Sequence, residues 1–342
     1  MSTPRLLASV VLALLACPLF AHELGLVQVE TMFRRDGTYA VDFLIDLEHL
    51  PPGTSPAAFL RKVEQNAALS FDGRRVPHER REVTNEPDGK AGVMRLRLLG
   101  RTPPAVSRFT FSNAAITDFY VLRLRTEGQR QPVTQWLESG KPSAPFPLDG
   151  TVVPQTRGAI IRQYLILGFT HILPYGLDHV LFVLGIFLLG TGLRPVLWQV
   201  SAFTVAHTIT LALTIYEVVS LPASVVEPLI ALSIVYVAIE NVLTTKLHAW
   251  RPLIVFGFGL LHGMGFAGVL TEIGIPRSEF VPALLAFNAG VEAGQLAVIL
   301  AAFLLLALPF RRKDWYRRRI AIPASLIIAG AGVYWFVERL TS

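Results

Sequence analysis

The sequence is poor in cysteine and in charge, and both deficits limit what the protein can be. Its 342 residues include one cysteine, Cys17, and only 16% of them are charged, against about 25% in a typical soluble chain. The deficit is uneven: residues 22–157 hold 18 Lys or Arg and 16 Asp or Glu, whereas residues 158–342 hold 12 and 9. This distribution excludes a single soluble domain, a disordered chain and a nucleic-acid-binding protein with a basic folded patch.

Residues 1–21 are predicted to be a secretory signal peptide. Arg5 precedes an apolar run, 6–16, that is too short to span a membrane comfortably, and we expect cleavage after Ala21. An alternative takes residues 14–17 as a lipoprotein signal, with Cys17 acylated. In the first interpretation the mature chain has no cysteine, so it forms no disulfide and any metal site must use His, Asp and Glu.

Four histidines lie outside the apolar half or in its loops. His22 is the expected mature N-terminus, where its amine and imidazole suit a metal such as Cu²⁺; the alternative is an ordinary first residue of a strand. His49, His78 and His248 are predicted to face solvent.

Residues 22–139 are predicted to form an exported, periplasmic all-β domain of the immunoglobulin-like sandwich type. The apolar stretches 24–30 and 39–45 flank an Asp-Gly hairpin turn. Residues 93–99 and 119–125 alternate apolar and polar side chains, which is typical of strands with one buried face. Residues 56–68 are the one helical candidate. Residues 140–157 contain four prolines and are predicted to be a linker.

Residues 158–342 are predicted to form an all-α six-helix transmembrane bundle. Charge-free runs of 22, 20 and 18 residues follow Arg194, Arg251 and Arg319, each close to the about 20 residues that a spanning helix needs. Two further apolar runs are interrupted by Glu240 and Glu292. The pattern predicts an interfacial helix over 160–173 and spans at about 176–193, 195–216, 224–245, 252–271, 280–308 and 320–337.

The charges that flank these spans predict their orientation. One set of loops carries Arg194, Lys246, Arg251 and the basic segment 311–319, whereas the other set carries Arg277 among acidic residues. Because basic loops stay on the cytoplasmic side, we expect a multi-pass protein of the bacterial inner membrane with its N-terminal domain and C-terminus in the periplasm. The net charge of +6 then reflects orientation in the lipid bilayer, and nucleic acid is not an expected partner.

A few polar side chains fall inside these spans, where burial in lipid is costly without a partner or a function. Imidazole and carboxylate ligands suit divalent nickel, cobalt, zinc or iron. Depth along the helices predicts that Asp178 and His179 lie nearer the outer surface than the midplane residues His207, His262 and Glu292. A single buried histidine is equally open to a packing role, and Glu240 to a paired role near the inner surface. The candidate ligands are His171, Asp178, His179, His207, His262 and Glu292, with Asn288, Gln295 and Glu240 as possible supporting residues.

The sequence Gly176-Leu177-Asp178-His179, with His171 upstream, resembles the signature of the HupE/UreJ family of membrane proteins. His262 followed by Gly263 resembles a later His-Gly element of that family. The resemblance covers about residues 165–340, and it implies a nickel or cobalt permease of the kind associated with hydrogenase and urease systems. It also implies that His171, Asp178 and His179 bind the metal ion.

Two features depart from the compact permeases. Six residues separate His171 from Asp178, where the usual spacing is five, and the large exported domain is absent from those permeases. The chain therefore resembles a longer branch of the family, in which the segment 287–295 is a feature of its own.

We therefore expect an inner-membrane divalent-metal transporter. Residues 171, 178 and 179 would capture the ion, residues 207, 262 and 292 would coordinate it, and Glu240 would relay it inward. One alternative is an intramembrane zinc-dependent hydrolase with Glu292 as general base, although no His-Glu-x-x-His sequence is present. Another is a non-transporting metal-sensing or assembly protein. In each case the exported domain has a possible periplasmic partner.

Overall fold

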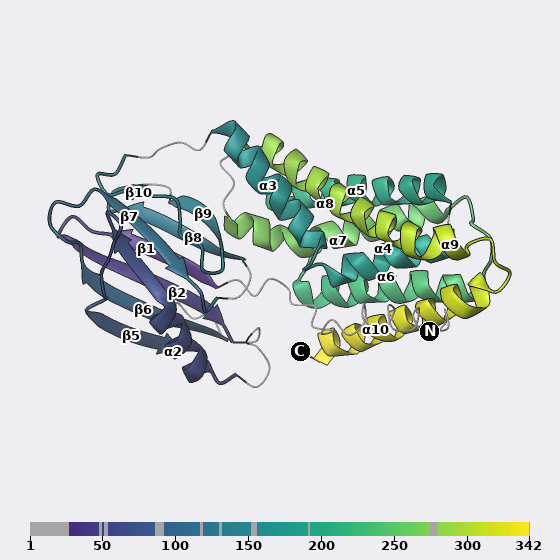
Figure 1. Ribbon diagram of the computed structural model, residues 1–342, viewed down its shortest axis with the longest axis horizontal. Coiled ribbons are helices and arrows are strands. Elements are labelled where there is room, and N and C mark those ends of the chain that lie inside the picture. The colour runs from purple at the N-terminus through teal and green to yellow at the C-terminus, as the bar shows by residue number, and fades with distance from the viewer. Residues whose placement is uncertain are drawn as a thin grey trace. The chain divides into compact units, whose positions relative to one another are not determined.

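The computed structural model describes residues 27–341 except 48–49, 51–53, 86–91, 117–118, 130–131, 152–155, 191 and 274–278. The described residues fall into two compact units, one within His22–Pro154 and the other within Gln155–Ser342, which we call the β unit and the helical unit (Figure 1). The predicted signal peptide, the lipoprotein alternative at Cys17, and the interpretations of His22 and His49 all lie outside the described residues.

The β unit contains two sheets. The larger has the strand order β5-β6-β2-β1-β8-β9, in which β1 and β8 are parallel, and the smaller has the order β10-β7-β3-β4 (Figure 1). The strands are β1 (Gln28–Phe33), β2 (Thr38–Asp46), β3 (Ala67–Phe71), β4 (Arg74–Arg75), β5 (Arg80–Asn85), β6 (Val93–Arg101), β7 (Arg108–Asn113), β8 (Phe119–Thr126), β9 (Val133–Glu138) and β10 (Phe146–Pro147).

The predicted hairpin forms between β1 and β2. Gly37 has a φ of 78°, a left-handed conformation that glycine adopts without steric cost, and the Asp36 carboxylate accepts the Thr38 N–H at 2.9 Å. The turn pairs Phe33 with Tyr39 across the strands. Burial alternates along β1 and along most of β2, so that one face of the hairpin is buried and the other is mostly half-buried.

Both sheets contribute to one aromatic core. Phe33 of β1 lies 5.0 Å, centroid to centroid, from Phe109 of β7, and Phe43 of β2 lies 5.9 Å from Phe111. Helix α2 (Pro56–Asn66) begins at the N-cap Ser55 and adds its buried apolar side chains to the same core. A β-sheet region is thus confirmed, whereas its immunoglobulin-like character stays a prediction.

The predicted linker begins too early in the sequence. Residues 146–147 form β10, which pairs with β7, and the Phe146 side chain is buried in the core. Ser143 is also buried, and its backbone N–H donates to the Phe111 carbonyl at 2.7 Å. Part of the proline-containing segment is therefore an edge strand and not a linker. Proline fits there because an edge strand tolerates a residue without an N–H.

The helical unit contains one helix for each predicted segment, with ends within a few residues of those predicted. They are α3 (Arg157–Ile172), α4 (Leu177–Leu189), α5 (Leu193–Ile215), α6 (Ala223–Leu243), α7 (Arg251–Ile273), α8 (Phe280–Ala302) continued by the π-helical turn η3 (Phe303–Ala307) and α9 (Leu308–Phe310), and the π-helical turn η4 (Arg317–Ala321) continued by α10 (Ile322–Thr341).

Four of these helices are long and apolar enough to cross a membrane: Leu193–Ile215, Ala223–Leu243, Phe280–Phe310 and Arg317–Thr341. The pair α3 and α4 qualifies as a fifth if it is taken as one span with a bend of 68°. The described part of α7 qualifies as a shorter apolar helix, Arg251–Phe266. The structure thus supports a multi-pass membrane unit with four or five spans, and the sixth span stays a prediction.

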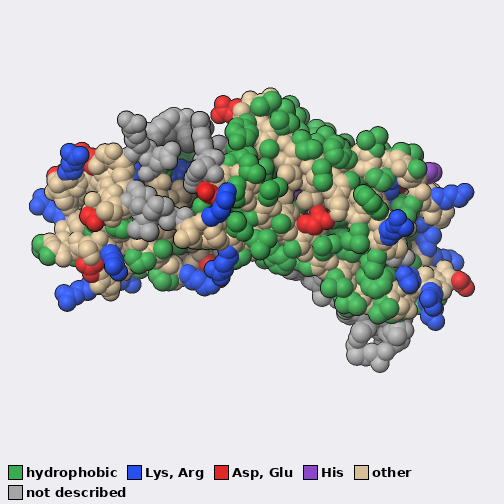
Figure 2. Space-filling view, turned by 90° about the horizontal axis from the view of Figure 1, so that it is seen from above, with side chains coloured by type: hydrophobic (Ala, Val, Ile, Leu, Met, Phe, Trp, Pro, Cys, Tyr) green, Lys and Arg blue, Asp and Glu red, His purple; other side chains and the backbone are tan. Residues whose placement is uncertain are grey.

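The surface of the helical unit differs from that of the β unit. Among the described residues of the β unit, Val83 alone is an exposed large apolar side chain, whereas such side chains occur on α3, α5, α6, α7, α8 and α10. Apolar side chains cover much of the helical unit in the space-filling view (Figure 2). Exposed apolar surface of this extent is characteristic of contact with lipid.

Candidate metal centre

A sharp bend between α3 and α4 brings two histidines together. In a continuous helix, His171 and His179 would lie about 12 Å apart along the axis. The 68° bend instead places their ring centroids 4.7 Å apart. Gly176 makes the turn possible, since a Cβ there would lie 2.2 Å from the His171 carbonyl oxygen. The signature spacing therefore encodes a turn that folds one histidine back onto the other.

Close packing of α5 against α7 positions the other two histidines. A Cβ on Gly263 would lie 2.5 Å from the His207 carbonyl oxygen, and a Cβ on Gly259 would lie 2.5 Å from that of Phe203. These two glycines let the backbones touch, as small residues do between membrane helices. His207 on α5 and His262 on α7 consequently project from adjacent helices.

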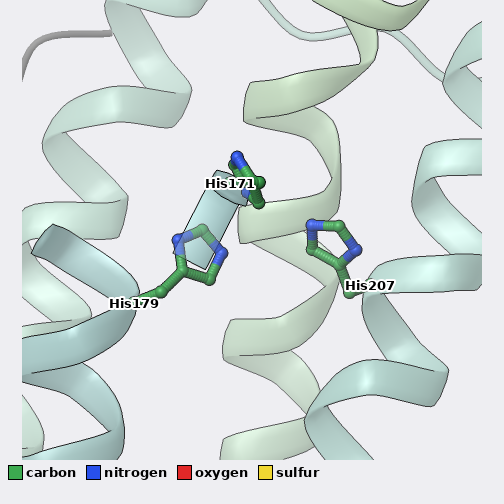
Figure 3. A group of neighbouring side chains, drawn as sticks. All are labelled: His171, His179 and His207. Carbon is green, nitrogen blue, oxygen red and sulfur yellow. The ribbon is translucent and has the colours of Figure 1, made fainter. Parts of the chain in front are cut away.

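The four histidines form one cluster with His179 at its centre. The His179 ring lies 4.8 Å from that of His262, 4.7 Å from that of His171 and 6.0 Å from that of His207, measured between centroids. Figure 3 shows His171, His179 and His207 around a common space. Two overlapping groups of candidate ligands result, His171 with His179 and His207, and Asp178 with His179 and His262; the ligand atoms of each group lie within 4.8 Å of one another.

Hydrogen bonds fix the ring proton of His179 and His207. The Asp178 carboxylate accepts both the backbone N–H of His179, at 2.7 Å, and its Nδ1–H, at 2.9 Å. The Asn288 amide donates to the Leu284 carbonyl at 2.9 Å, so its Oδ1 faces His207 and accepts the Nδ1–H at 3.1 Å. Because a neutral imidazole carries one proton, the Nε2 atom of each ring keeps its lone pair.

Those lone pairs are buried without partners. Among the described residues, no hydrogen-bond partner is found for Nε2 of His171, His179 and His207 or for Nδ1 of His262. Buried polar atoms in native proteins are nearly always satisfied, and each exception calls for an explanation. Four unpaired imidazole nitrogens around one space fit the donor set of a divalent transition metal.

Phenylalanine rings surround the cluster and keep it apolar. Phe266 lies 4.0 Å from the His171 ring, Phe203 lies 5.0 Å from the His262 ring, and Phe182 lies 5.3 Å from the same ring. Such walls offer no hydrogen bonds to the free nitrogens. A cation is the ligand that these nitrogens and the Asp178 carboxylate together would stabilise best.

Glu292 lies outside both groups of candidate ligands. Its Oε1 accepts a hydrogen bond from the Ser201 hydroxyl at 2.8 Å, and the neighbouring Gln295 accepts one from Thr204 at 3.0 Å. The predicted common face of Asn288, Glu292 and Gln295 thus points towards α5. Within that face, Asn288 is the residue that reaches the histidine cluster.

Glu240 belongs to a separate buried ion pair. Its Oε2 lies 2.9 Å from Nε of Arg251, and Arg251 also donates to Asn241 at 3.4 Å. The sequence predicted that Arg251 lies in an inner loop; it instead begins α7, and its side chain is 1% exposed. The reason is the carboxylate opposite, since a buried guanidinium requires a paired charge.

The predicted difference in depth between the signature residues and the later histidines is wrong. His179 lies in contact with His262 and close to His207, because the α3–α4 break lets the start of α4 enter the bundle. Sequence reasoning missed Ser233, whose Oγ lies 3.1 Å from Nε2 of His262. The only available signal was a serine in an apolar span, which does not reveal its partner on another helix.

The helical unit matches a known protein family. The family model described as HupE / UreJ protein matches residues 149–339, which is more than half of the chain and includes all helices from α3 to α9 and most of α10. No curated protein and no solved structure matches the chain.

Proposed function

Because the chain belongs to the HupE / UreJ family, we propose that it carries a divalent transition-metal ion of the nickel or cobalt type across the bacterial inner membrane. The observation that carries this proposal is the set of four buried imidazole nitrogens, on His179 and its three neighbouring histidines, for which the described residues offer no hydrogen-bond partner. An apolar ligand fits these nitrogens poorly, because it would leave each of them buried without a hydrogen bond.

In this proposal His179 is the central ligand. Asp178 orients its ring and raises its basicity, as carboxylates do for metal-binding histidines. His171 and His207 complete one group of ligands, and His262 with Asp178 completes the other. An ion that passes between the two groups keeps His179 as a ligand throughout, so it is never released into the apolar surroundings.

The remaining polar residues have other places in the proposal. Glu292 and Ser201 lie between α5 and α8, and we assign them to the path of the ion beside the cluster. Glu240 is held by Arg251 and would meet the ion only if that pair separated. The proposed orientation has six spans, the β unit and C-terminus in the periplasm, and the basic segment 311–319 on the cytoplasmic side. The β unit would meet a periplasmic partner or cover the entrance.

Metal uptake by cells that express single variants tests the function. We expect Asp178→Ala and His179→Ala each to abolish uptake of radioactive nickel or cobalt, because each removes a ligand and frees the other side chain from its hydrogen bond. The matched control is His248→Ala. His248 stacks on Trp250 at 5.4 Å and lies outside both ligand groups, so its removal should leave uptake unchanged.

Uptake that persists in both signature variants, at equal protein levels, would contradict the proposal. The hydrolase alternative would require Glu292 to act as a general base that accepts a proton from a water molecule at the cluster. Its hydrogen bond with Ser201 gives that role no support, so transport is the function that we favour. Metal content of the purified variants, measured alongside uptake, separates loss of binding from loss of movement.

A further inference from the structure

The His262 ring is held differently from the other rings of the cluster. Its hydrogen-bond partner is a hydroxyl: Oγ of Ser233, on α6, lies 3.1 Å from Nε2. Ser233 is 1% exposed and His262 is equally buried. Carboxylate and amide oxygens can only accept, whereas a hydroxyl can donate or accept. The direction of this hydrogen bond therefore has to be worked out.

The carbonyl of Ile230 decides that direction. Ser233 Oγ lies 2.6 Å from this carbonyl oxygen, one turn earlier on α6, and a carbonyl can only accept. The single hydroxyl proton of Ser233 is therefore used, and towards His262 the oxygen presents a lone pair. The ring must donate Nε2–H, so a neutral His262 has its own lone pair on Nδ1.

Burial makes the same assignment from the other side of the ring. Nδ1 of His262 has no hydrogen-bond partner within the described part of the chain. A proton on Nδ1 would be a buried donor without an acceptor, and it would leave Nε2 facing the lone pair of Ser233. Both ends of the ring thus favour one tautomer, with the free lone pair on Nδ1, and His262 belongs to the ligand group of Asp178 and His179.

We propose that Ser233 is a positioning residue that makes Nδ1 of His262 the metal-binding nitrogen, whereas His179 and His207 bind through Nε2. The hydrogen-bond chain runs from the Ile230 carbonyl through the Ser233 hydroxyl to Nε2–H. It fixes the ring orientation and the tautomer before an ion arrives. Partners of this kind around metal-binding histidines typically change affinity 10–100-fold. The affinity part of this inference rests on the proposed metal function, and the tautomer part does not.

The first test needs no metal and no variant of Ser233. We would record two-bond ¹H–¹⁵N correlation spectra of ¹⁵N-histidine-labelled full-length protein in nanodiscs, with His262 assigned by the signal lost in His262→Gln. The expected spectrum shows a protonated Nε2 and a bare Nδ1. A proton on Nδ1 of His262 would overturn the inference, whatever the protein binds.

The second test measures affinity for nickel and cobalt by equilibrium dialysis. Ser233→Ala should weaken binding about 10–100-fold, and Ser233→Thr, which keeps the hydroxyl, should restore most of it. The control is Ser325→Ala, since Ser325 is also fully buried in the helical unit but bonds Asn241. An equal loss in Ser233→Ala and Ser325→Ala would show a merely structural role and overturn the inference. A wild-type protein that binds neither metal would overturn the proposed function, and the tautomer spectrum would still decide the role of Ser233.

Discussion

At the scale of single residues, three of the four cluster histidines owe their free nitrogens to three different chemical partners. His179 donates to a carboxylate, His207 to an amide oxygen and His262 to a hydroxyl oxygen. The three partners lie on three different helices, α4, α8 and α6. No one-dimensional pattern links them, yet each obeys the same rule, that a neutral imidazole with its proton engaged presents its other nitrogen as a ligand.

Inside the β unit, the buried side chain of Asn113 connects β7 to α2 and to the turn that follows β7. Its amide donates to the Val63 carbonyl at 2.8 Å and its Oδ1 accepts the Ala115 N–H at 2.8 Å. Its backbone N–H donates to the Tyr120 hydroxyl at 3.0 Å. The side chain is completely buried, so these hydrogen bonds replace all contact with water.

We predict that Asn113→Ala lowers the stability of the β unit by about 2–4 kcal/mol, because it leaves a buried carbonyl and a buried N–H without partners. Hydrogen exchange of the β7 amides in the full-length protein measures this loss. Asn66→Ala is the control, since the Asn66 amide bonds Lys62 in an exposed position. A change at Asn113 no larger than at Asn66 would contradict the prediction.

At the scale of the elements, glycines decide how α3 meets α8. A Cβ on Gly168 would lie 1.9 Å from the Phe287 carbonyl oxygen, and a Cβ on Gly290 would lie 2.1 Å from that of Leu165. Both obstacles are backbone atoms, which cannot move aside as a side chain can. This contact also sets the cluster, because His171 follows Gly168 by one turn and Asn288 precedes Gly290 by two residues.

We predict that Gly168→Ala pushes α3 away from α8 and thereby moves His171 out of the cluster. Thermal unfolding in nanodiscs should begin at a lower temperature, and nickel affinity should fall. Gly330→Ala is the matched control, since a Cβ at this helical glycine meets nothing within 4 Å and alanine favours a helix by about 0.5–1 kcal/mol. Equal unfolding temperatures for the two variants would show that the α3–α8 contact yields to a methyl group.

At the scale of the whole molecule, the two units differ in the side chains that they expose to their surroundings. The β unit buries an aromatic core of its own and, among its described residues, exposes one large apolar side chain. The helical unit exposes large apolar side chains on six of its helices, α3, α5, α6, α7, α8 and α10, and buries three histidines, His179, His207 and His262. One unit is thus built for water outside, and the other for lipid outside.

We predict that residues 22–154 fold alone as a soluble β protein, because their core is complete without the helical unit. Circular dichroism should show β-structure that is lost in one cooperative thermal transition. Phe109→Ala should lower the stability by about 3–5 kcal/mol, whereas Val83→Ala, at an exposed site, should leave it nearly unchanged. Aggregation of the wild-type fragment would indicate that its core needs the rest of the chain.

The sequence predicted the helices and strands well and the long-range contacts between them poorly. The hydrophobic runs gave helices within a few residues of those observed, because a membrane span is defined by length and apolarity alone. The strands at 93–99 and 119–125 followed from alternation, which is likewise local. The early linker boundary failed because Phe146 joins the core through pairing with β7, a contact 37 residues away that local composition does not contain.

Composition and periodicity alone indicate that the chain has a water-facing and a lipid-facing part, and that beyond Cys17 it offers no thiolate to a metal. Which polar residues come into contact follows from the packing of the helices: it brings together His171, Asp178, His179, His207 and His262, places Glu292 beside Ser201 and places Ser233 beside His262. The physical reason is that helix contacts are set by where a glycine lets two backbones touch and by where a turn bends, and both depend on the partner helix as much as on the sequence at the contact.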